Sequence, residues 1–151
     1  MTPAEKQTQP HVLAVCRNSR RGPKPVVAEI RLLPGVGVEQ DAHAGTGERE
    51  VSLLAWESHQ RFQPRTPVQL KPGIFGENIT TMGIDFARLQ VKDRLQLNDC
   101  VLEITRKGKE CRTPCAISRN VGECIMPREC VFARVIQGGI LRAGDPIHKK
   151  S

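Results

Sequence analysis

The segment of residues 107–119 combines the residue types that thiol chemistry requires. Its two cysteines, Cys111 and Cys115, stand four positions apart, and Pro114 between them interrupts a regular backbone. Its positive charges come from four side chains: Lys107, Lys109, Arg112 and Arg119. Positive charge near a thiol lowers its pKa and favours the nucleophilic thiolate. The segment is therefore a candidate site for a reactive or metal-binding cysteine. The alternative stays open, that each cysteine is a small buried apolar residue beside solvated basic side chains.

Two further uses of these thiols follow from the rest of the sequence. Cys111, Cys115, Cys124 and Cys130 have spacings of four, nine and six, and His43 is a candidate fifth ligand for zinc. Structural zinc sites usually have two pairs of ligands, each pair roughly two to four residues apart. Only the first pair fits, so a structural zinc domain is the weaker alternative. A nucleophilic pair of Cys115 with His43 is another alternative.

Length and composition limit the classes of partner. A chain of 151 residues has the length of one domain, with room for a sizeable core. The net charge is +7, but aromatic residues make up only 3% and tyrosine is absent. Single-stranded nucleic acids bind on exposed aromatic side chains, so we expect an anionic small molecule rather than nucleic acid. The sequence has no apolar run of about eighteen residues, so we expect no membrane span.

The N-terminus and the cysteine content indicate the compartment. Residues 1–10 are polar, lack the apolar centre of a secretory signal, and are expected to form a flexible tail. Six cysteines in a chain of this size do not indicate the disulfide framework of a small secreted domain. We therefore expect a cytoplasmic protein with free, catalytic or metal-bound thiols, in which residues 11–151 form a single domain.

Short apolar segments between glycine- and proline-containing turns predict a mostly β fold. The expected strands cover residues 12–15, 25–33, 51–54, 89–91, 94–97, 100–105, 131–136 and 146–148. One helix is expected over residues 56–62, ending before Pro64. A closed or nearly closed β-barrel with one or a few short helices suits this pattern, because closure removes exposed sheet edges.

Several segments occur in the order of a known family. They are residues 41–45 (Asp-Ala-His-Ala-Gly), 49–54, 75–85, 91–95, 111–115, 132–135 and 144–145. Together they resemble a MOSC domain, the C-terminal domain of molybdenum-cofactor sulfurases, from about residue 12 to residue 147. The most specific part is Gly76-Glu77-Asn78 followed by Thr80.

The resemblance implies a β-barrel-like fold and a role in sulfur or molybdenum-cofactor chemistry. In that family a cysteine carries sulfur as a persulfide or ligates molybdenum, and the position after Thr-Pro matches Cys115. Cys115 is thus the first candidate for the reactive thiol and for a molybdenum ligand, with Cys111 as a supporting thiol and His43 as a catalytic partner. The motif residues Glu77, Asn78 and Thr80 are implied to bind the cofactor.

The same resemblance suggests how a cofactor and a donor are recruited. Lys109, Arg112 and Arg119 would hold the phosphate of a molybdenum-pterin cofactor, the arginines through bidentate hydrogen bonds. Since the cysteine-desulfurase domain of the sulfurases is missing, a sulfur-donor protein such as a desulfurase is expected in trans. A molybdenum-dependent reductase of N-hydroxylated compounds is a narrower variant. A non-catalytic module that binds an anionic cofactor is the alternative.

Overall fold

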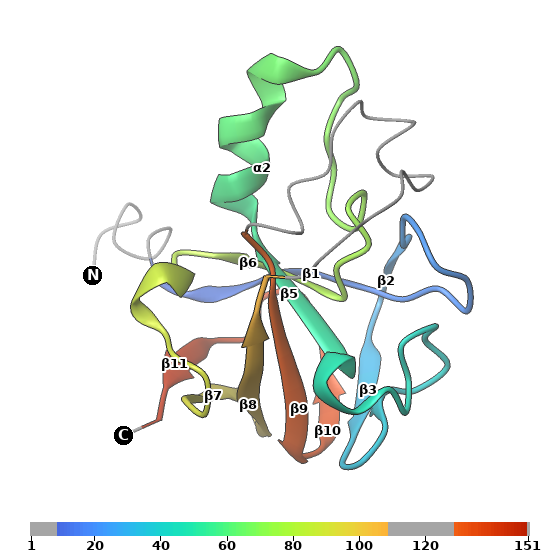
Figure 1. Cartoon of the computed structure of the whole chain (residues 1–151), viewed down its shortest axis with the longest axis vertical. Coiled ribbons are helices and arrows are strands. Elements are labelled where there is room, and N and C mark those ends of the chain that lie inside the picture. Colours follow the sequence, from blue (N-terminus) through green and yellow to red (C-terminus); the bar gives the residue numbers. More distant parts are fainter. Residues whose placement is uncertain (1–8, 109–128, 151) are drawn as a thin grey trace.

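The described part of the protein is a curled, nearly closed β structure with a short α-helix at one end (Figure 1). The computed structural model describes residues 9–108 and 129–150. Its larger sheet has eight strands in the order β11-β7-β8-β9-β5-β6-β1-β2, and a smaller sheet has the order β10-β3-β4. The predicted class, a mostly β, nearly closed barrel-like fold with few short helices, is confirmed.

The strands are short, and most are bounded by turns. Those of the larger sheet are β1 (His11–Cys16), β2 (Val26–Val27), β5 (Val51–Ala55), β6 (Ile79–Met82), β7 (Arg94–Leu97), β8 (Cys100–Lys107), β9 (Val131–Gln137) and β11 (Ile147–Lys149). Those of the smaller sheet are β3 (Ile30–Leu33), β4 (Gly37–Val38) and β10 (Gly139–Leu141). The helical segments are α2 (Trp56–Phe62) and the 3-10 turns η1 (Gly47–Arg49), η2 (Gln63–Arg65) and η3 (Phe86–Arg88).

Strands β5 and β6 are the one parallel pair among the strands described, and α2 lies in the connection between them. A parallel pair requires such a crossover, which explains why the helix predicted over residues 56–62 sits at this point of the chain. The helix lies at the top of Figure 1, above the end of the sheet. Among the described residues, no helix has the length and apolar character needed to cross a membrane.

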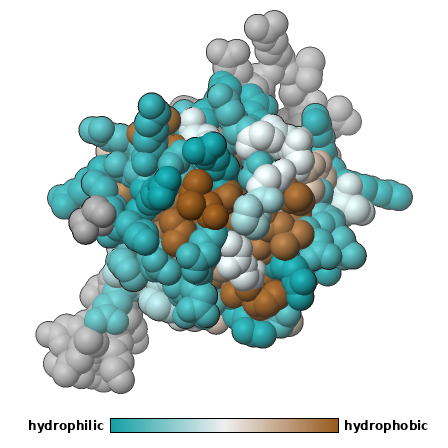
Figure 2. Space-filling model, turned by 90° about the horizontal axis from the view of Figure 1, so that it is seen from below, coloured by the Kyte–Doolittle hydropathy of each residue, from teal (hydrophilic) through white to brown (hydrophobic). Residues whose placement is uncertain are grey.

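Apolar side chains of both sheets meet in one core. Its largest fully buried members include Ile30 and Leu32 of the smaller sheet and Leu53, Leu95 and Leu102 of the larger one. A second cluster packs between α2 and the sheet, and it contains Leu54, Phe62, Leu70, Ile74, Phe75, Cys130 and Phe132. On the face opposite α2, apolar side chains form separate patches between hydrophilic ones (Figure 2).

Three expectations about strands were wrong in detail. The segment 25–33 is divided into β2 and β3, because the chain leaves the larger sheet and enters the smaller one. Residues 89–91 are not a strand and instead follow η3. Strand β6 was not among the expected strands, and its two polar residues Thr80 and Thr81 are fully buried. Threonine is β-branched and fits a strand when its hydroxyl has a partner, as that of Thr80 does.

Candidate functional site

The cysteine-bearing segment begins and ends at one place in the fold. Six residues with predicted roles lie outside the described residues, so these roles stay predictions. They are Cys111, Cys115, Cys124, Lys109, Arg112 and Arg119. The backbone N–H of Gly108 donates to the carbonyl of Cys130 at 2.7 Å, next to the paired strands β8 and β9. The site can therefore be built from the described residues near this sheet end and from the loops that face them.

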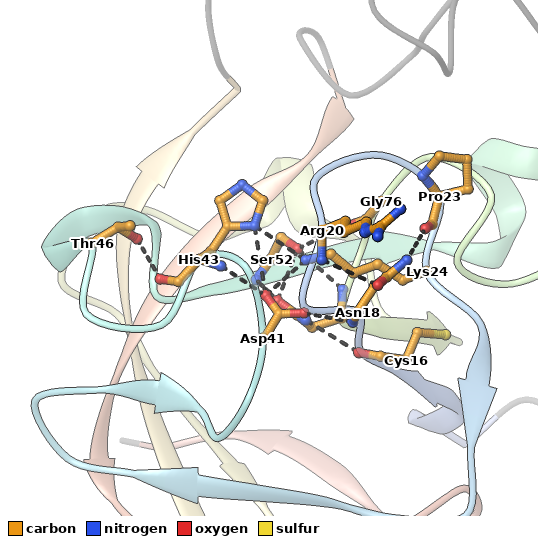
Figure 3. Close-up of polar contacts among 11 residues, drawn as sticks. Cys16, Asn18, Arg20, Pro23, Lys24, Asp41, His43, Thr46, Ser52 and Gly76 are labelled. Atoms are coloured by element: carbon orange, nitrogen blue, oxygen red, sulfur yellow. Dashed lines mark hydrogen bonds and ion pairs between the residues drawn. The ribbon is translucent and has the colours of Figure 1, made fainter.

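Lys24, Asp41 and His43 form a cluster between two loops (Figure 3). The Nζ atom of Lys24 donates to Oδ2 of Asp41 at 2.8 Å and lies 3.1 Å from Nδ1 of His43. The side chains of Lys24 and Asp41 are fully buried, whereas that of His43 is 21% exposed. The buried ion pair is thus covered from solvent, and the histidine ring forms the accessible edge of this Lys24–Asp41–His43 cluster.

The loop of residues 41–46 holds the cluster in place through its backbone. The backbone N–H of His43 donates to Oδ2 of Asp41 at 3.1 Å, and the carbonyl of His43 accepts from the Thr46 hydroxyl at 2.6 Å. The backbone N–H of Asn18 donates to the other carboxylate oxygen of Asp41 at 3.1 Å. Asp41 therefore joins this loop to the β1–β2 loop, and both of its oxygens have partners.

These partners explain the acidity of Asp41. Burial alone would raise the pKa of its carboxyl group, because it disfavours the charged form. The charge and hydrogen bond of Lys24, together with the Asn18 amide, outweigh burial and hold the pKa of this carboxyl group well below its usual range. Asp41 is therefore a carboxylate that compensates Lys24, rather than a proton donor.

Gly73 fixes the backbone at Lys24. The backbone N–H of Lys24 donates to the carbonyl of Gly73 at 2.8 Å. A Cβ atom on Gly73 would lie 2.0 Å from the Lys24 carbonyl oxygen, and the φ angle there is +83°. Only glycine permits both this close approach and this conformation without strain.

The motif residue Asn78, which directly precedes β6, bonds to strands β1 and β5. Its side-chain Nδ2 donates to the carbonyl of Cys16 in β1 at 3.1 Å. Its Oδ1 accepts from the backbone N–H of Ser52 in β5 at 3.1 Å and lies 3.2 Å from the Ser52 hydroxyl. Asn78 is fully buried, so these contacts give it a structural role. Direct contact with a cofactor stays a prediction for this residue.

Glu77 and Thr80 lie in a second buried polar group with His59. Oε2 of Glu77 is 2.8 Å from Nε2 of His59 and accepts from the Thr80 hydroxyl at 2.8 Å. Nδ1 of His59 lies 3.0 Å from the carbonyl of Ala55, which can only accept, so Nδ1 carries a proton. All three side chains are fully buried, and cofactor binding by Glu77 and Thr80 stays a prediction as well.

Cys16 lies between these two polar groups, at the end of β1. Burial and, after it, the Glu77 carboxylate raise the pKa of its thiol to about 12, although Lys24 and a hydrogen bond with Thr80 act in the opposite direction. Burial and the carboxylates of Asp99 and Asp145 also raise the pKa of Cys100. Cys16 and Cys100 are buried and free, so neither of them is a thiolate nucleophile at neutral pH.

The β1–β2 loop, which contacts the cluster through Asn18, is cationic. The β1–β2 loop carries Arg17, Arg20 and Arg21, of which the last two are exposed. Asn18 ties this loop to the cluster, because its carbonyl accepts from the Ala42 backbone N–H at 2.8 Å. Among the residues that the structure describes, no ion pair involves these three arginines. The accessible edge of His43 and this loop thus provide positive charge and N–H donors, which suit an anionic group.

A separate cavity of about 530 Å³ lies beside the N-terminal half of α2, and Arg61, Lys107 and Glu129 are among its lining residues. Its polar groups bind one another, since Arg61 and Ser58 both donate to Oε1 of Glu129. Within residues 9–108 and 129–150, no group of three histidine, cysteine or acidic side chains is arranged to hold a metal ion. The zinc alternative needs cysteines outside this part of the chain.

The sequence pattern singled out His43 but not its partners. Lys24 is one of several basic residues in its loop, and His59 falls within the helix predicted over residues 56–62, where its side chain is fully buried. Cys16 and Ser52 carried no signal as isolated residues within apolar strands. The signal that could have found Lys24 is its position between two prolines, which indicates a fixed backbone at a residue that is usually mobile.

Comparisons with known proteins agree with this architecture. The MOSC domain family matches residues 40–148, which include Asp41, His43 and the Glu77-Asn78 motif. The YuaD protein from Bacillus subtilis has a similar fold, with a TM-score of 0.76 and 15% identity over 91% of this chain and 93% of that one. No curated protein matches the sequence.

Two further solved structures share the fold. YiiM from Geobacillus stearothermophilus has a TM-score of 0.71 and 16% identity, covering 94% of this chain and 75% of that one. YiiM from Escherichia coli has a TM-score of 0.64 and 19% identity, covering 93% of this chain and 69% of that one. The family match covers well over half of the sequence, and the resemblance expected from the motifs is confirmed. The chain belongs to the MOSC domain family.

Proposed function

We propose that this MOSC domain protein binds an anionic ligand beside His43 and the β1–β2 loop, and that Cys115 transfers sulfur at that site. The observation that supports the anionic ligand is the Lys24–Asp41–His43 cluster under a loop with three arginines. The buried pair of Lys24 and Asp41 is neutral as a unit. The loop arginines therefore leave the accessible edge of the cluster positively charged.

The length of the chain allows Cys115 to reach this site. Three steps across the sheet, from β9 through β5 and β6, lead to β1, which ends beside the cluster. At about 4.8 Å for each step, the separation is about 14 Å. Cys115 stands seven positions after Gly108, and seven residues span up to about 25 Å.

The proposed transfer is a thiolate attack on a persulfide. The thiolate of Cys115 attacks the outer sulfur of a donor persulfide, and a new S–S bond forms. The S–S bond of the donor breaks, and its thiolate leaves and takes up a proton. Cys115 then holds the additional sulfur as a persulfide, and no external oxidant or reductant is consumed. The cationic residues around Cys115 in the sequence favour the thiolate that this step requires.

A molybdenum-pterin cofactor is one anionic ligand that suits these residues. Its phosphate requires N–H donors and positive charge, and the exposed Arg20 and Arg21 and the part-exposed His43 can supply both. We propose that these residues, with Lys109, Arg112 and Arg119, hold the phosphate, and that Cys115 is the candidate ligand of the metal. When bound, such a cofactor would supply redox chemistry at molybdenum.

Mass spectrometry of the Cys115 peptide tests the sulfur transfer. The protein is incubated with a cysteine desulfurase and cysteine, and we expect one added sulfur on Cys115 in the wild type. We expect Cys111→Ser to retain the added sulfur and Cys115→Ser to lose it. A wild-type protein that gains no sulfur, or a Cys115→Ser variant that gains as much as wild type, would refute the proposed transfer.

A second candidate function is a module that carries an anionic cofactor without covalent chemistry. It is favoured by the fact that the polar contacts of the Lys24–Asp41–His43 cluster need no thiolate. It predicts that Cys115→Ser keeps the affinity for the ligand, whereas Arg20→Ala or Arg112→Ala weakens it. We further propose a reducing compartment such as the cytoplasm, since the described cysteines Cys16 and Cys100 form no disulfide.

A further inference from the structure

We propose that Lys24 and Asp41 are a positioning pair that fixes His43 as a hydrogen-bond donor, through Nε2–H, to an oxyanion. This assignment deepens the proposed function, on which its ligand depends, but the state of the histidine ring can be measured without any ligand. It also changes the role expected for His43, which the sequence suggested as a catalytic partner of Cys115.

The first step is the polarity of the contact between Lys24 and His43. An ammonium group carries three N–H donors and has no lone pair, so a ring nitrogen 3.1 Å from it can only accept. The Nδ1 atom of His43 therefore presents its lone pair to Lys24. In a neutral imidazole the single N–H must then be on Nε2.

The second step excludes the competing contact. The carboxylate oxygen Oδ2 of Asp41 could accept a proton from Nδ1, which would give the opposite tautomer. However, Oδ2 lies 3.6 Å from Nδ1, beyond the range of a good hydrogen bond, while it is 2.8 Å from Nζ of Lys24 and 3.1 Å from the His43 backbone N–H. Asp41 thus orients Lys24 and the loop backbone, and Lys24 sets the tautomer of the ring.

The third step is the direction of the free edge of the ring. Figure 3 shows the other ring nitrogen of His43 pointing away from Lys24 and Asp41. The backbone of His43 is held at both ends, by Asp41 at its N–H and by Thr46 at its carbonyl. A donor that is held in this way before a ligand arrives loses little conformational entropy on binding.

The chemical consequence concerns Cys115. The basic site of the fixed ring is Nδ1, which faces the buried Lys24 and cannot be reached by a thiol. His43 is therefore unsuited to take the proton of Cys115. Its Nε2–H is suited to donate a hydrogen bond to a phosphate or another oxyanion, which the positive charge of the β1–β2 loop would also attract.

Long-range ¹H–¹⁵N correlation spectra of the ¹⁵N-labelled protein test the tautomer directly. The four histidines are assigned by single substitutions, and we expect His43 to show a protonated Nε2 and an unprotonated Nδ1. His59 is an internal reference, because its Nδ1 must carry a proton beside the carbonyl of Ala55. A wild-type His43 with the proton on Nδ1 would overturn the inference, whatever the variants do.

Two variants test the positioning role. In Lys24→Met with Asp41→Asn, which removes both buried charges together, we expect the His43 signals to shift towards a mixture of tautomers while those of His59 stay unchanged. The unchanged His59 signals report that the variant is folded. If the His43 tautomer stays fixed in this folded variant, the Lys24–Asp41 pair does not set it and the inference fails.

Titration with inorganic phosphate tests the donor role. His43→Gln keeps an N–H donor near the position of Nε2, whereas His43→Ala has none. We expect His43→Ala to bind phosphate about ten-fold or more weakly than wild type, and His43→Gln to bind more tightly than His43→Ala. Equal affinity of wild type and His43→Ala would overturn the donor role. If none of the proteins binds phosphate while the tautomer is as expected, the anion site of the proposed function is wrong and the tautomer assignment stands.

Discussion

Substitution of Asn78 by alanine separates a structural role of the MOSC motif from a ligand-binding role. The change removes the acceptor of the Ser52 backbone N–H and the donor to the Cys16 carbonyl, both in the buried interior. The unpaired N–H of Ser52 costs about 1–3 kcal/mol. The lost hydrogen bonds to the Cys16 carbonyl and from the Ser52 hydroxyl each cost about 0.5–1.5 kcal/mol. We therefore expect Asn78→Ala to lower the free energy of unfolding by about 2–6 kcal/mol. That loss is a large fraction of the roughly 5–15 kcal/mol that stabilises a domain.

Urea unfolding followed by the fluorescence of Trp56, the single tryptophan, measures this loss. With a slope of about 2 kcal/mol per molar urea, the midpoint is expected to fall by about 1–3 M. Gln90→Ala is the matched control, because Gln90 is also an amide but is exposed, and its side chain makes no hydrogen bond in the described structure. We expect the control to stay within about 0.5 kcal/mol of wild type.

A double variant sharpens the test of Asn78. Since Ser52 and Asn78 bond each other, the combined loss in Ser52→Ala with Asn78→Ala should be smaller than the two single losses added together. A stability of Asn78→Ala equal to that of the Gln90→Ala control would refute the reasoning. The motif would then have to be explained by ligand contact alone.

Three other perturbations address neighbouring parts of the site. Gly73→Ala is expected to lower the free energy of unfolding by more than Gly45→Ala, as calorimetry would show, because both have a positive φ but only Gly73 meets a backbone oxygen, that of Lys24. The folded-state pKa of Asp41 is lowered, so its stabilising contribution is complete above the unfolded value of about 4 and is lost as the pH falls below it. Acid unfolding should therefore depend less on pH in Asp41→Asn, and an unchanged dependence would contradict the ion pair with Lys24. With a pKa of about 12, Cys16 in the folded protein should react with a thiol reagent at pH 8 at least about 10³-fold more slowly than a free thiol. Fast modification of the native protein would show that this thiol is accessible.

The elements that sequence patterns predicted well are those with a local cause. Helix α2 has the expected bounds because Pro64 interrupts the regular helix after Phe62. Strand β8 follows the alternation of Leu102 and Ile104 with the residues between them. The strand expected over residues 25–33 fails because its division between two sheets depends on partners far away in the chain.

The same distinction holds for the site. His43 stood out because glycine and alanine surround it in a recognisable motif. Lys24 precedes it by nineteen positions and becomes its partner only when the β1–β2 loop meets the loop of residues 41–46. Burial decides the roles of Cys16 and His59, and burial of single residues in this fold depends on how α2 covers the end of the sheet. Such partners are tertiary properties that residue spacing does not contain.

The pterin content of the purified protein tests the proposed anionic site most directly. The wild type, His43→Ala and the Gln90→Ala control are purified without reductant, and the ligand is released and oxidised to its fluorescent pterin form. We predict that the wild type and the control release equal amounts of pterin, and that His43→Ala releases much less. Pterin retained equally by all three proteins, or absent from the wild type, would contradict a cofactor site beside His43.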